Sequence, residues 1–183
     1  MYGLINEAMR RHVTDSAGAE AWSRITDRAD TPDSFAGLHY YDDDVTYALV
    51  GAASVELDTP AEDLLRSFGR YWSNHVGPEE YGSILGATGT DFVSVLTNLD
   101  TMHARIQTLY PDLRPPSFSV RDHVDGMLEV DYRSERSGLS PFVVGLLEGL
   151  GELYGTPATV VQVGSTDAGA DHDSFLVRLD RGA

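Results

Sequence analysis

The chain has 183 residues, 42% of them hydrophobic and 9% aromatic, and is therefore long enough to fold as one globular domain with a buried core. Its formal net charge of -16 opposes binding to DNA, RNA or anionic membrane surfaces, whereas a protein partner with a basic face is compatible with it. The absence of cysteine excludes disulfides, iron–sulfur clusters and zinc sites built on thiolates.

The N-terminus is amphipathic and acidic, without the basic region that opens a signal peptide. No apolar segment approaches the length of a membrane span. We therefore expect a soluble, cytoplasmic protein.

Helical patterns occupy the first two-thirds of the chain. Apolar residues at helical spacing predict a helix at the N-terminus, a second around residues 19–28 and a third after Asp42. The segment 59–62 is typical of a helix start, with a capping threonine and a proline in the first turn. The helix that follows is expected to end at Gly77-Pro78.

Two further helices are expected over residues 78–87 and 91–110. Pro111 and the Pro115-Pro116 pair prevent the second of them from continuing. From residue 118 the apolar period changes from 3.6 to 2, which indicates strands.

The last third predicts a sheet interrupted by one helix. Strands are expected over 118–123, 128–136, 158–163 and 174–179, with a hairpin turn at 125–126 and a helix over 140–154. We therefore predict an α+β fold in one domain over 1–183. Its N-terminal helical part covers about 1–60, and helices with an antiparallel sheet cover about 61–183.

His103 lies on the apolar face of the predicted helix over 91–110. A single histidine in such a place is more often an ordinary core or surface residue than a ligand. Here its neighbours form an apolar wall, which suits a neutral imidazole that binds haem iron. The wall residues are Leu96, Leu99, Met102 and Ile106.

About thirty residues later, Tyr132, Ser134 and Arg136 fall on one face of a predicted strand. Hydroxyls and a guanidinium are suitable donors for the two haem propionates. The alternative is an ordinary strand whose inner face becomes polar at its end. That alternative is plausible for Ser134 but would leave Arg136 in need of a buried anionic partner.

Two other segments have both a structural and a functional interpretation. In the predicted helix over 140–154, Gly145 and Gly149 leave room for a flat ligand or for close helix–sheet packing. The residues Asp171-His172-Asp173 are compatible with a divalent cation site, although a solvated loop is the favoured interpretation.

The motifs at residues 1–6 (MYGLIN), 98–105 (NLDTMHAR), 114–118 (RPPSF) and 132–136 (YRSER) resemble successive motifs of the H-NOX family. These haem nitric oxide/oxygen binding domains are related to the haem domain of soluble guanylate cyclase. The resemblance covers essentially the whole chain and keeps the motif order. It implies haem b buried between the helical part and the sheet part.

The resemblance also implies individual roles. His103 would be the proximal iron ligand, and Tyr132, Ser134 and Arg136 would bind the propionates. Pro116 would press on the porphyrin and distort it, and Ile5 would touch it from the N-terminal helix.

On the distal side, members that bind oxygen stably carry a tyrosine where this chain has Phe142. Phenylalanine offers no hydrogen bond to bound dioxygen, which favours NO and CO with weak or no O2 binding. Trp72 matches a distal tryptophan of some bacterial members, and its indole N–H puts the strength of oxygen exclusion in question.

The resemblance therefore implies a gas sensor that binds NO and signals to a separate enzyme. The expected partner is a histidine kinase, a cyclic-di-GMP enzyme or a relative of guanylate cyclase. The chain itself is not expected to be an enzyme, because a peroxidase or NO dioxygenase needs a distal acid–base pair that Ile5, Trp72 and Phe142 lack. An oxygen-binding or redox haem sensor, a haem carrier and a domain without haem stay open as alternatives.

Overall fold

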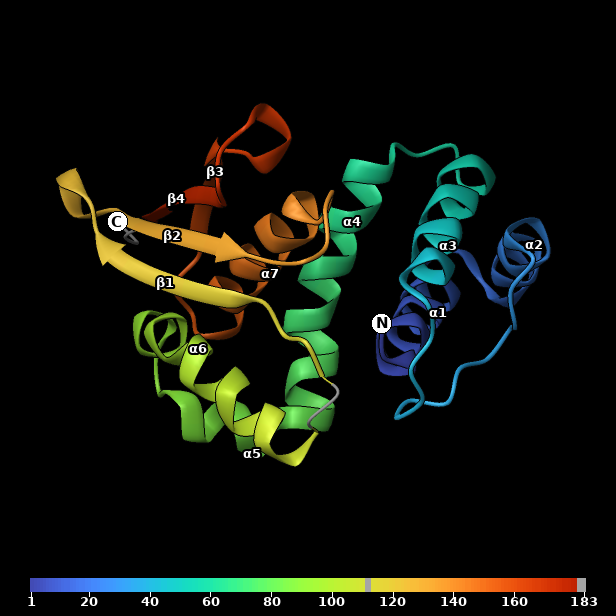
Figure 1. Cartoon of the computed structure of the whole chain (residues 1–183), viewed down its shortest axis with the longest axis horizontal. Coiled ribbons are helices and arrows are strands. Elements are labelled where there is room, and N and C mark those ends of the chain that lie inside the picture. Colours follow the sequence, from blue (N-terminus) through green and yellow to red (C-terminus); the bar gives the residue numbers. More distant parts are fainter. Residues whose placement is uncertain (111–112, 181–183) are drawn as a thin grey trace. The chain divides into compact units, whose positions relative to one another are not determined.

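The computed structural model of the chain describes residues 1–110 and 113–180 and contains helices together with a four-stranded antiparallel sheet (Figure 1). The chain divides into two compact units, Met1–Phe68 and a second that begins at Gly69. The expected α+β class is confirmed, whereas the single domain stays a prediction. No helix in the described ranges is long and apolar enough to cross a membrane.

The first unit is helical, as the apolar spacing predicts. It contains α1 (Gly3–Ala17), α2 (Ala19–Ala29), α3 (Asp43–Glu56) and most of α4 (Ala61–Tyr71). Asp42 caps α3, because its carboxylate accepts the N–H of Asp44 at 3.2 Å. The helices bury a core that includes Met9, Val13, Trp22, Ile25, Leu49 and Phe35.

One position of α1 differs from the apolar pattern. The apolar Ile5 is half-buried, whereas the polar Asn6 beside it is fully buried. Asn6 lies on the same helical face as Met9 and Val13, and its side-chain oxygen accepts the hydroxyl of Thr46 at 2.7 Å. A polar pair between α1 and α3 thus occupies the place expected for an apolar side chain.

The expected helix end at Gly77-Pro78 is wrong. The backbone continues from α4 through a π-helical turn, Trp72–Val76, into α5 (Gly77–Thr88). In this turn the N–H of Gly77 donates to the carbonyl of Trp72, five residues earlier. The wider turn accommodates Pro78, whose ring would clash with the carbonyl four residues back in a regular α-helix.

The helix α6 (Phe92–Leu109) begins with a capping box, in which the side chains of Asp91 and Ser94 each accept the other's backbone N–H. Its predicted extent is confirmed to within a residue at each end. Pro111, one of the expected helix breakers, lies outside the described residues.

The sheet has the order β1-β2-β4-β3, and all of its pairs are antiparallel. Its strands are β1 (Ser117–Asp122), β2 (Leu128–Arg133), β3 (Ala158–Gly164) and β4 (Asp173–Leu179). The β1–β2 hairpin turns at Asp125 and Gly126, which both have positive φ values, 60° and 71°, as a tight hairpin turn requires. The helix α7 (Ser140–Leu153) packs with α6 against one face of the sheet (Figure 1).

The core of the second unit lies between this sheet face and the two helices. Alternate residues of β2 enter it, as the period of 2 predicts. Its buried members include Leu96, Leu99, Val130, Tyr132, Leu147 and Phe175. This core holds α6 against β1, and the candidate site depends on that contact.

Candidate functional site

His103 projects from α6 and is fixed by a backbone group beyond the helix. Its Nδ1 lies 3.0 Å from the carbonyl oxygen of Pro116, which can only accept, so Nδ1 carries the proton. Burial lowers the pKa of His103, and the Pro116 carbonyl and nearby Asp100 offset this only in part. A neutral ring protonated on Nδ1 has its lone pair on Nε2, which is the form a metal requires.

Two features place the Pro116 carbonyl beside the histidine. Asp100, one helical turn before His103, accepts the backbone N–H of Phe118 at 3.3 Å and ties α6 to the start of β1. Neither Pro115 nor Pro116 has an N–H to contribute to a helix or a sheet ladder, so the chain here stays extended ahead of β1.

Phe118 lies between His103 and Tyr132, the first of the predicted propionate-binding residues. Its ring centroid lies 5.8 Å from that of His103 and 5.3 Å from that of Tyr132. Both aromatic residues are buried, and they face each other across the β1–β2 pair. The structure therefore brings His103 and Tyr132 to the same end of the core.

Ser134 and Arg136 do not share a strand face with Tyr132, so this part of the sequence prediction is wrong. The strand β2 ends at Arg133, opposite Ser117, where β1 begins. The reason is that Pro116 precedes Ser117 and cannot donate to a ladder, so β2 has no partner there beyond Arg133.

The residues after β2 form a turn of their own. The hydroxyl of Ser134 accepts the backbone N–H of Arg136 at 3.0 Å. The guanidinium of Arg136 donates to the carbonyl of Arg114 at 3.1 Å. Arg136 is half-buried rather than enclosed in the core, so the argument that it needs a buried anion does not hold. The Arg114 carbonyl is one of its partners.

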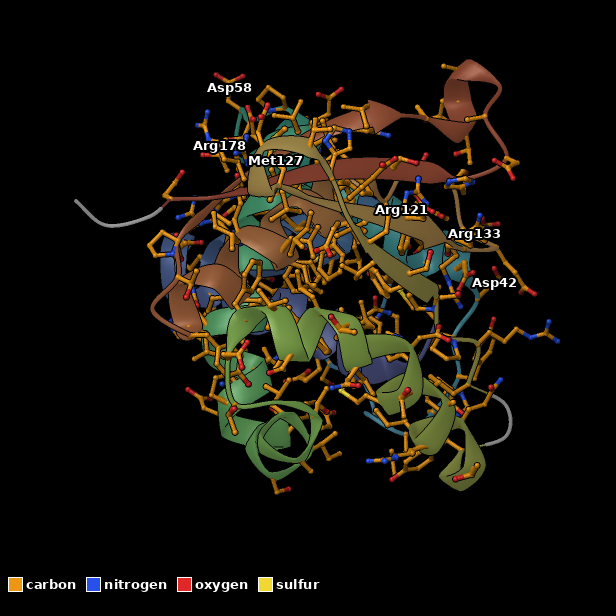
Figure 2. All side chains as sticks on the ribbon, turned by 90° about the vertical axis from the view of Figure 1, so that its left-hand side faces the viewer. Asp42, Asp58, Arg121, Met127, Arg133 and Arg178 are labelled. Carbon is orange, nitrogen blue, oxygen red and sulfur yellow. The ribbon has the colours of Figure 1, made fainter. Side chains whose placement is uncertain are left out.

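An open cavity of about 580 Å³ adjoins this turn. Ser134 is the predicted site residue that lines it, together with Gln107, Arg114, Pro115, Ser117, Arg133 and Glu135. Arg114 pairs with Glu135 at 3.2 Å, and Figure 2 shows Arg133 projecting from the sheet. Two guanidiniums and two serine hydroxyls make this end of β2 suited to anionic groups.

The predicted distal residues lie on two packed helical segments. Trp72, in the π-helical turn, is half-buried and stacks on Tyr81, with centroids 6.4 Å apart and 19° between the ring planes. Burial raises the pKa of the Tyr81 phenol, so it keeps its proton and can donate a hydrogen bond. Phe142 is half-buried in the first turn of α7.

The glycine face of α7 is explained by helix packing. A Cβ on Gly149 would lie 2.8 Å from the Cβ of Ser73, and one on Gly69 would lie 2.1 Å from the carbonyl oxygen of Phe142. The Ser73 hydroxyl donates to the Leu146 carbonyl at 2.8 Å. The expected close approach is present, but at Gly149 the neighbour is the π-helical turn rather than the sheet.

The segment Asp171-His172-Asp173 makes structural contacts and does not form a metal site. Asp173 is buried and accepts hydrogen bonds from the Ser140 hydroxyl and the Thr166 N–H. The half-buried ring of His172 lies 3.2 Å from the carboxylate of Asp131. Within the described residues, no group of three acidic, histidine or cysteine side chains could hold a metal ion. The expectation of a solvated loop is therefore wrong for His172 and Asp173.

Comparison with known proteins assigns the chain to a family. A sequence model described as Haem-NO-binding matches residues 2–162. The chain belongs to this family. The resemblance predicted from the four motifs is confirmed, and with it the coarse assignment to haem-binding gas-sensor domains.

Curated relatives of this Haem-NO-binding chain include two soluble guanylate cyclases. The Caenorhabditis elegans gcy-35 protein is 31% identical over 153 residues, covering 80% of this chain and 22% of that protein. The Drosophila melanogaster 89Db protein is 26% identical over 161 residues, covering 87% of this chain and 24% of that protein. The chain thus spans about a quarter of the length of these relatives.

Solved structures confirm the H-NOX fold. An H-NOX protein from S. oneidensis in the Fe(II)NO ligation state matches with a TM-score of 0.87 at 19% identity, covering 99% of this chain and 100% of that one. The unliganded Fe(II) H-NOX protein from K. algicida matches with a TM-score of 0.83 at 20% identity, covering 100% and 98%. At these identities the likeness shows the fold alone.

The roles of individual residues in this Haem-NO-binding chain stay predictions. The structure brings His103, Pro116 and Tyr132 together and places Ser134 and Arg136 in the adjoining turn. Leu99 is buried in the core, and Met102 packs against it. Ile5 belongs to the first unit.

Three contacts of the site were not found from the sequence. They are the Pro116 carbonyl on His103, the ring of Phe118 and the carboxylate of Asp100. Asp100 lies three residues before His103, so helical spacing puts both on one face. Nothing in the sequence indicates which acceptor the imidazole meets, because that depends on where β1 packs.

Proposed function

We propose that this chain binds haem b through His103 and uses it to sense NO. The observation that carries the proposal is the Nδ1 hydrogen bond of His103 to the Pro116 carbonyl at 3.0 Å. Together with the lowered pKa, it leaves a neutral ring with Nε2 able to ligate iron. The absence of cysteine from the chain agrees with histidine as the axial ligand.

Tyr132, Ser134 and Arg136 would bind the two propionates. The proposal is supported by their position at one end of β2, where the cavity lined by Arg114 and Arg133 adds further donors. A guanidinium offers a carboxylate several N–H groups, and the hydroxyls add one each. The guanidinium of Arg136 donates to the Arg114 carbonyl at 3.1 Å, which holds Arg136 beside this cavity-lining residue.

Pro116 would act twice. Its carbonyl holds the imidazole, and its ring would press on the porphyrin, as the family resemblance implies. Leu99 and Met102, on the same helix as His103, would supply the apolar surroundings. Ile5 would add a contact from α1.

Residues on the distal side favour NO and CO over O2. Phe142 has no donor for a polarised dioxygen ligand, whereas a neutral NO needs less stabilisation of that kind. Trp72 and Tyr81 carry an N–H and an O–H, and these are the donors that would limit the exclusion of oxygen.

Bound ferrous haem would supply an iron that binds these gases, and NO would weaken or break its bond to His103. His103 lies on α6 and is tied to the residue that precedes β1, so a change at the imidazole would be transmitted to both elements. NO can shift an equilibrium between two conformations of the protein only to the extent that its affinity for the two conformations differs.

The signal would pass to a catalytic partner. The curated relatives are guanylate cyclases, which supports an enzyme as the receiver. A guanylate cyclase relative, a histidine kinase or a cyclic-di-GMP enzyme are the candidate partners. The chain would be the sensor and not the catalyst.

The decisive experiment replaces the proposed ligand. His103→Gly should yield protein without haem unless imidazole is supplied during expression, and the rescued protein should bind NO without passing on the signal. Wild-type protein should show the absorption spectrum of a five-coordinate ferrous haem. With NO, the spectrum should become that of a haem whose histidine has been displaced.

His39→Gly is the matched control, because His39 is exposed in the first unit and should keep full haem content. Full haem content with an unchanged spectrum in His103→Gly would remove His103 from its role. A spectrum that keeps the histidine bond under NO would favour an oxygen or redox sensor instead.

A further inference from the structure

The two edges of the sheet differ in charge. At one edge, β1 carries Arg121 and Asp122 among its six residues. At the other edge, β3 has seven residues without any charge, and within the described part of the chain it pairs only with β4. An edge strand presents unpaired N–H and C=O groups that another strand can bind.

The uncharged region is wider than the strand. Residues 153–166 contain no charged side chain, and this is the longest such stretch in a chain in which 23% of residues are charged. A bulge in an edge strand hinders pairing with another chain. In β3 the only such irregularity among the described residues is the register shift between Gln162 and Gly164, at the end of the strand. The residues before it pair regularly from Ala158 to Gln162.

The outward side of β3 carries two exposed valines beyond Thr159, whose hydroxyl contacts Arg178 and Asp180. Val161 and Val163 are 55% and 54% exposed, while Val160 between α7 and the sheet is 6% exposed. Val161 lies opposite the half-buried Leu176 of β4, which extends the apolar surface by one strand. An open backbone edge thus lies beside exposed valines.

We propose that β3 is a self-association edge, which pairs in antiparallel register with β3 of a second copy of this chain. A two-fold axis across the strand would match donors with acceptors, because the same edge presents both. Val161 and Val163 of each copy would then pack beside those of the other. The sheet would continue from one molecule into the next as eight strands.

Charge favours a second copy over a cationic partner. A partner recognised by its positive charge would bind the acidic surface, and residues 153–166 offer it nothing to recognise. Two copies with a net charge of -16 each repel each other over most of their surfaces. The electrostatic repulsion between them is smallest where the uncharged β3 strands face each other. A single pair of edge strands makes a small interface, so the dimer should be weak.

The first test measures association of the purified full chain by sedimentation velocity at concentrations from about 10 µM to about 1 mM. A monomer–dimer equilibrium is expected, and raising the NaCl concentration should strengthen it by screening repulsion. Val161→Lys should raise the dimer dissociation constant about tenfold or more. Val124→Lys, at a position that is 66% exposed in the β1–β2 turn, should leave it unchanged.

The second test uses the absence of cysteine from the chain. Single replacements Val161→Cys and Val163→Cys should form disulfide-linked dimers with diamide as oxidant, at least one of them far faster than Val124→Cys. Circular dichroism of each variant establishes that it is folded.

The proposal does not depend on haem binding. It is overturned if the folded wild-type chain stays monomeric at all concentrations, or if the three cysteine variants link at equal rates. Association that weakens with salt, or that continues beyond dimers, would equally contradict it, because β3 can be used only once per copy.

Discussion

His103 combines the two properties that an iron ligand needs, a fixed tautomer and a depressed proton affinity. The first comes from one hydrogen bond to a backbone carbonyl, and the second comes mainly from burial. Both arise from the packing of α6 against the start of β1. The fold therefore holds the imidazole in the neutral form that the proposed iron ligand needs.

The lowered pKa of His103 predicts a pH dependence of stability. As the pH falls below the ordinary value of 6.5, the unfolded chain takes up a proton that the folded chain does not, so stability is lost down through the lowered pKa. In urea unfolding of the haem-free chain, wild type should lose more stability between pH 7.5 and 5.5 than His103→Gln.

His39→Gln is the control for this comparison and should lose as much stability as wild type. Equal losses in wild type and His103→Gln would mean that the imidazole is not buried in its neutral form.

Phe142 is the residue that sets oxygen affinity in the proposed site. Phe142→Tyr would introduce a phenol that can donate to bound oxygen, and one such hydrogen bond is worth about 1 kcal/mol, or about fivefold. Oxygen should therefore dissociate from the ferrous protein about fivefold more slowly, as stopped-flow absorption would measure. Leu153→Tyr, at the other end of α7, should have no such effect. An unchanged rate in Phe142→Tyr would place Phe142 away from the ligand.

Among the elements, the π-helical turn and α7 pack closely against each other. Small residues permit it, since Gly149 faces Ser73 and the backbone of Arg70. Polar groups then fix it, because Arg70 bonds to Glu152 and lies 3.7 Å from the buried Glu148, while Asn74 donates to Glu152 at 2.8 Å. The segments that carry Trp72 and Phe142 are thereby held against each other.

Two alanine substitutions in helices separate packing from helix propensity. Gly149→Ala should destabilise the protein by about 1–3 kcal/mol, because its Cβ would lie 3.0 Å or less from Ser73 and Arg70 atoms. Gly82→Ala should be neutral or stabilise by up to about 1 kcal/mol, since nothing lies within 4 Å of its Cβ. Thermal or urea unfolding measures both. Equal effects at the two sites would show that the neighbours of Gly149 move aside for the new methyl group without loss of stability.

At the scale of the whole molecule, charge is the dominant property. The chain has 29 acidic residues against 13 basic ones, and all 13 basic residues are arginines. Arginine can bind a carboxylate through two N–H groups, as Arg121 does with Glu129 through Nε and Nη2, at 3.2 and 2.7 Å. Even if each of the 13 arginines paired with one carboxylate, the excess of acidic residues behind the net charge of -16 would remain, so the folded molecule repels itself.

Screening of this repulsion should stabilise the fold. Between low salt and about 0.5 M NaCl the unfolding free energy should rise by about 1 kcal/mol, which raises the melting temperature by about 2–4 °C for a chain of this size. Differential scanning calorimetry measures the shift, and KCl should reproduce it because screening does not depend on the cation. A melting temperature that falls with salt would show that individual ion pairs outweigh the net repulsion.

The α+β class, nearly all helix positions, the strand faces up to Arg133 and the family could be predicted without the structure. These features depend on local periodicity and on motifs that can be read residue by residue. The helix capped by Asp91 and the alternation of Leu128, Val130 and Tyr132 are examples. Each needs no knowledge of distant segments.

The end of β2, the group that fixes His103 and the helix that approaches Gly149 became known only from the packing of the folded chain. In each case the deciding group is distant in sequence: Pro116 for the strand end and the imidazole, and Ser73 for the glycine. The continuation of the helix through Pro78 likewise required a π-turn that apolar spacing does not reveal. Contacts with backbone carbonyls and close helix packing cannot be predicted from side-chain periodicity, because they form only when the elements pack together.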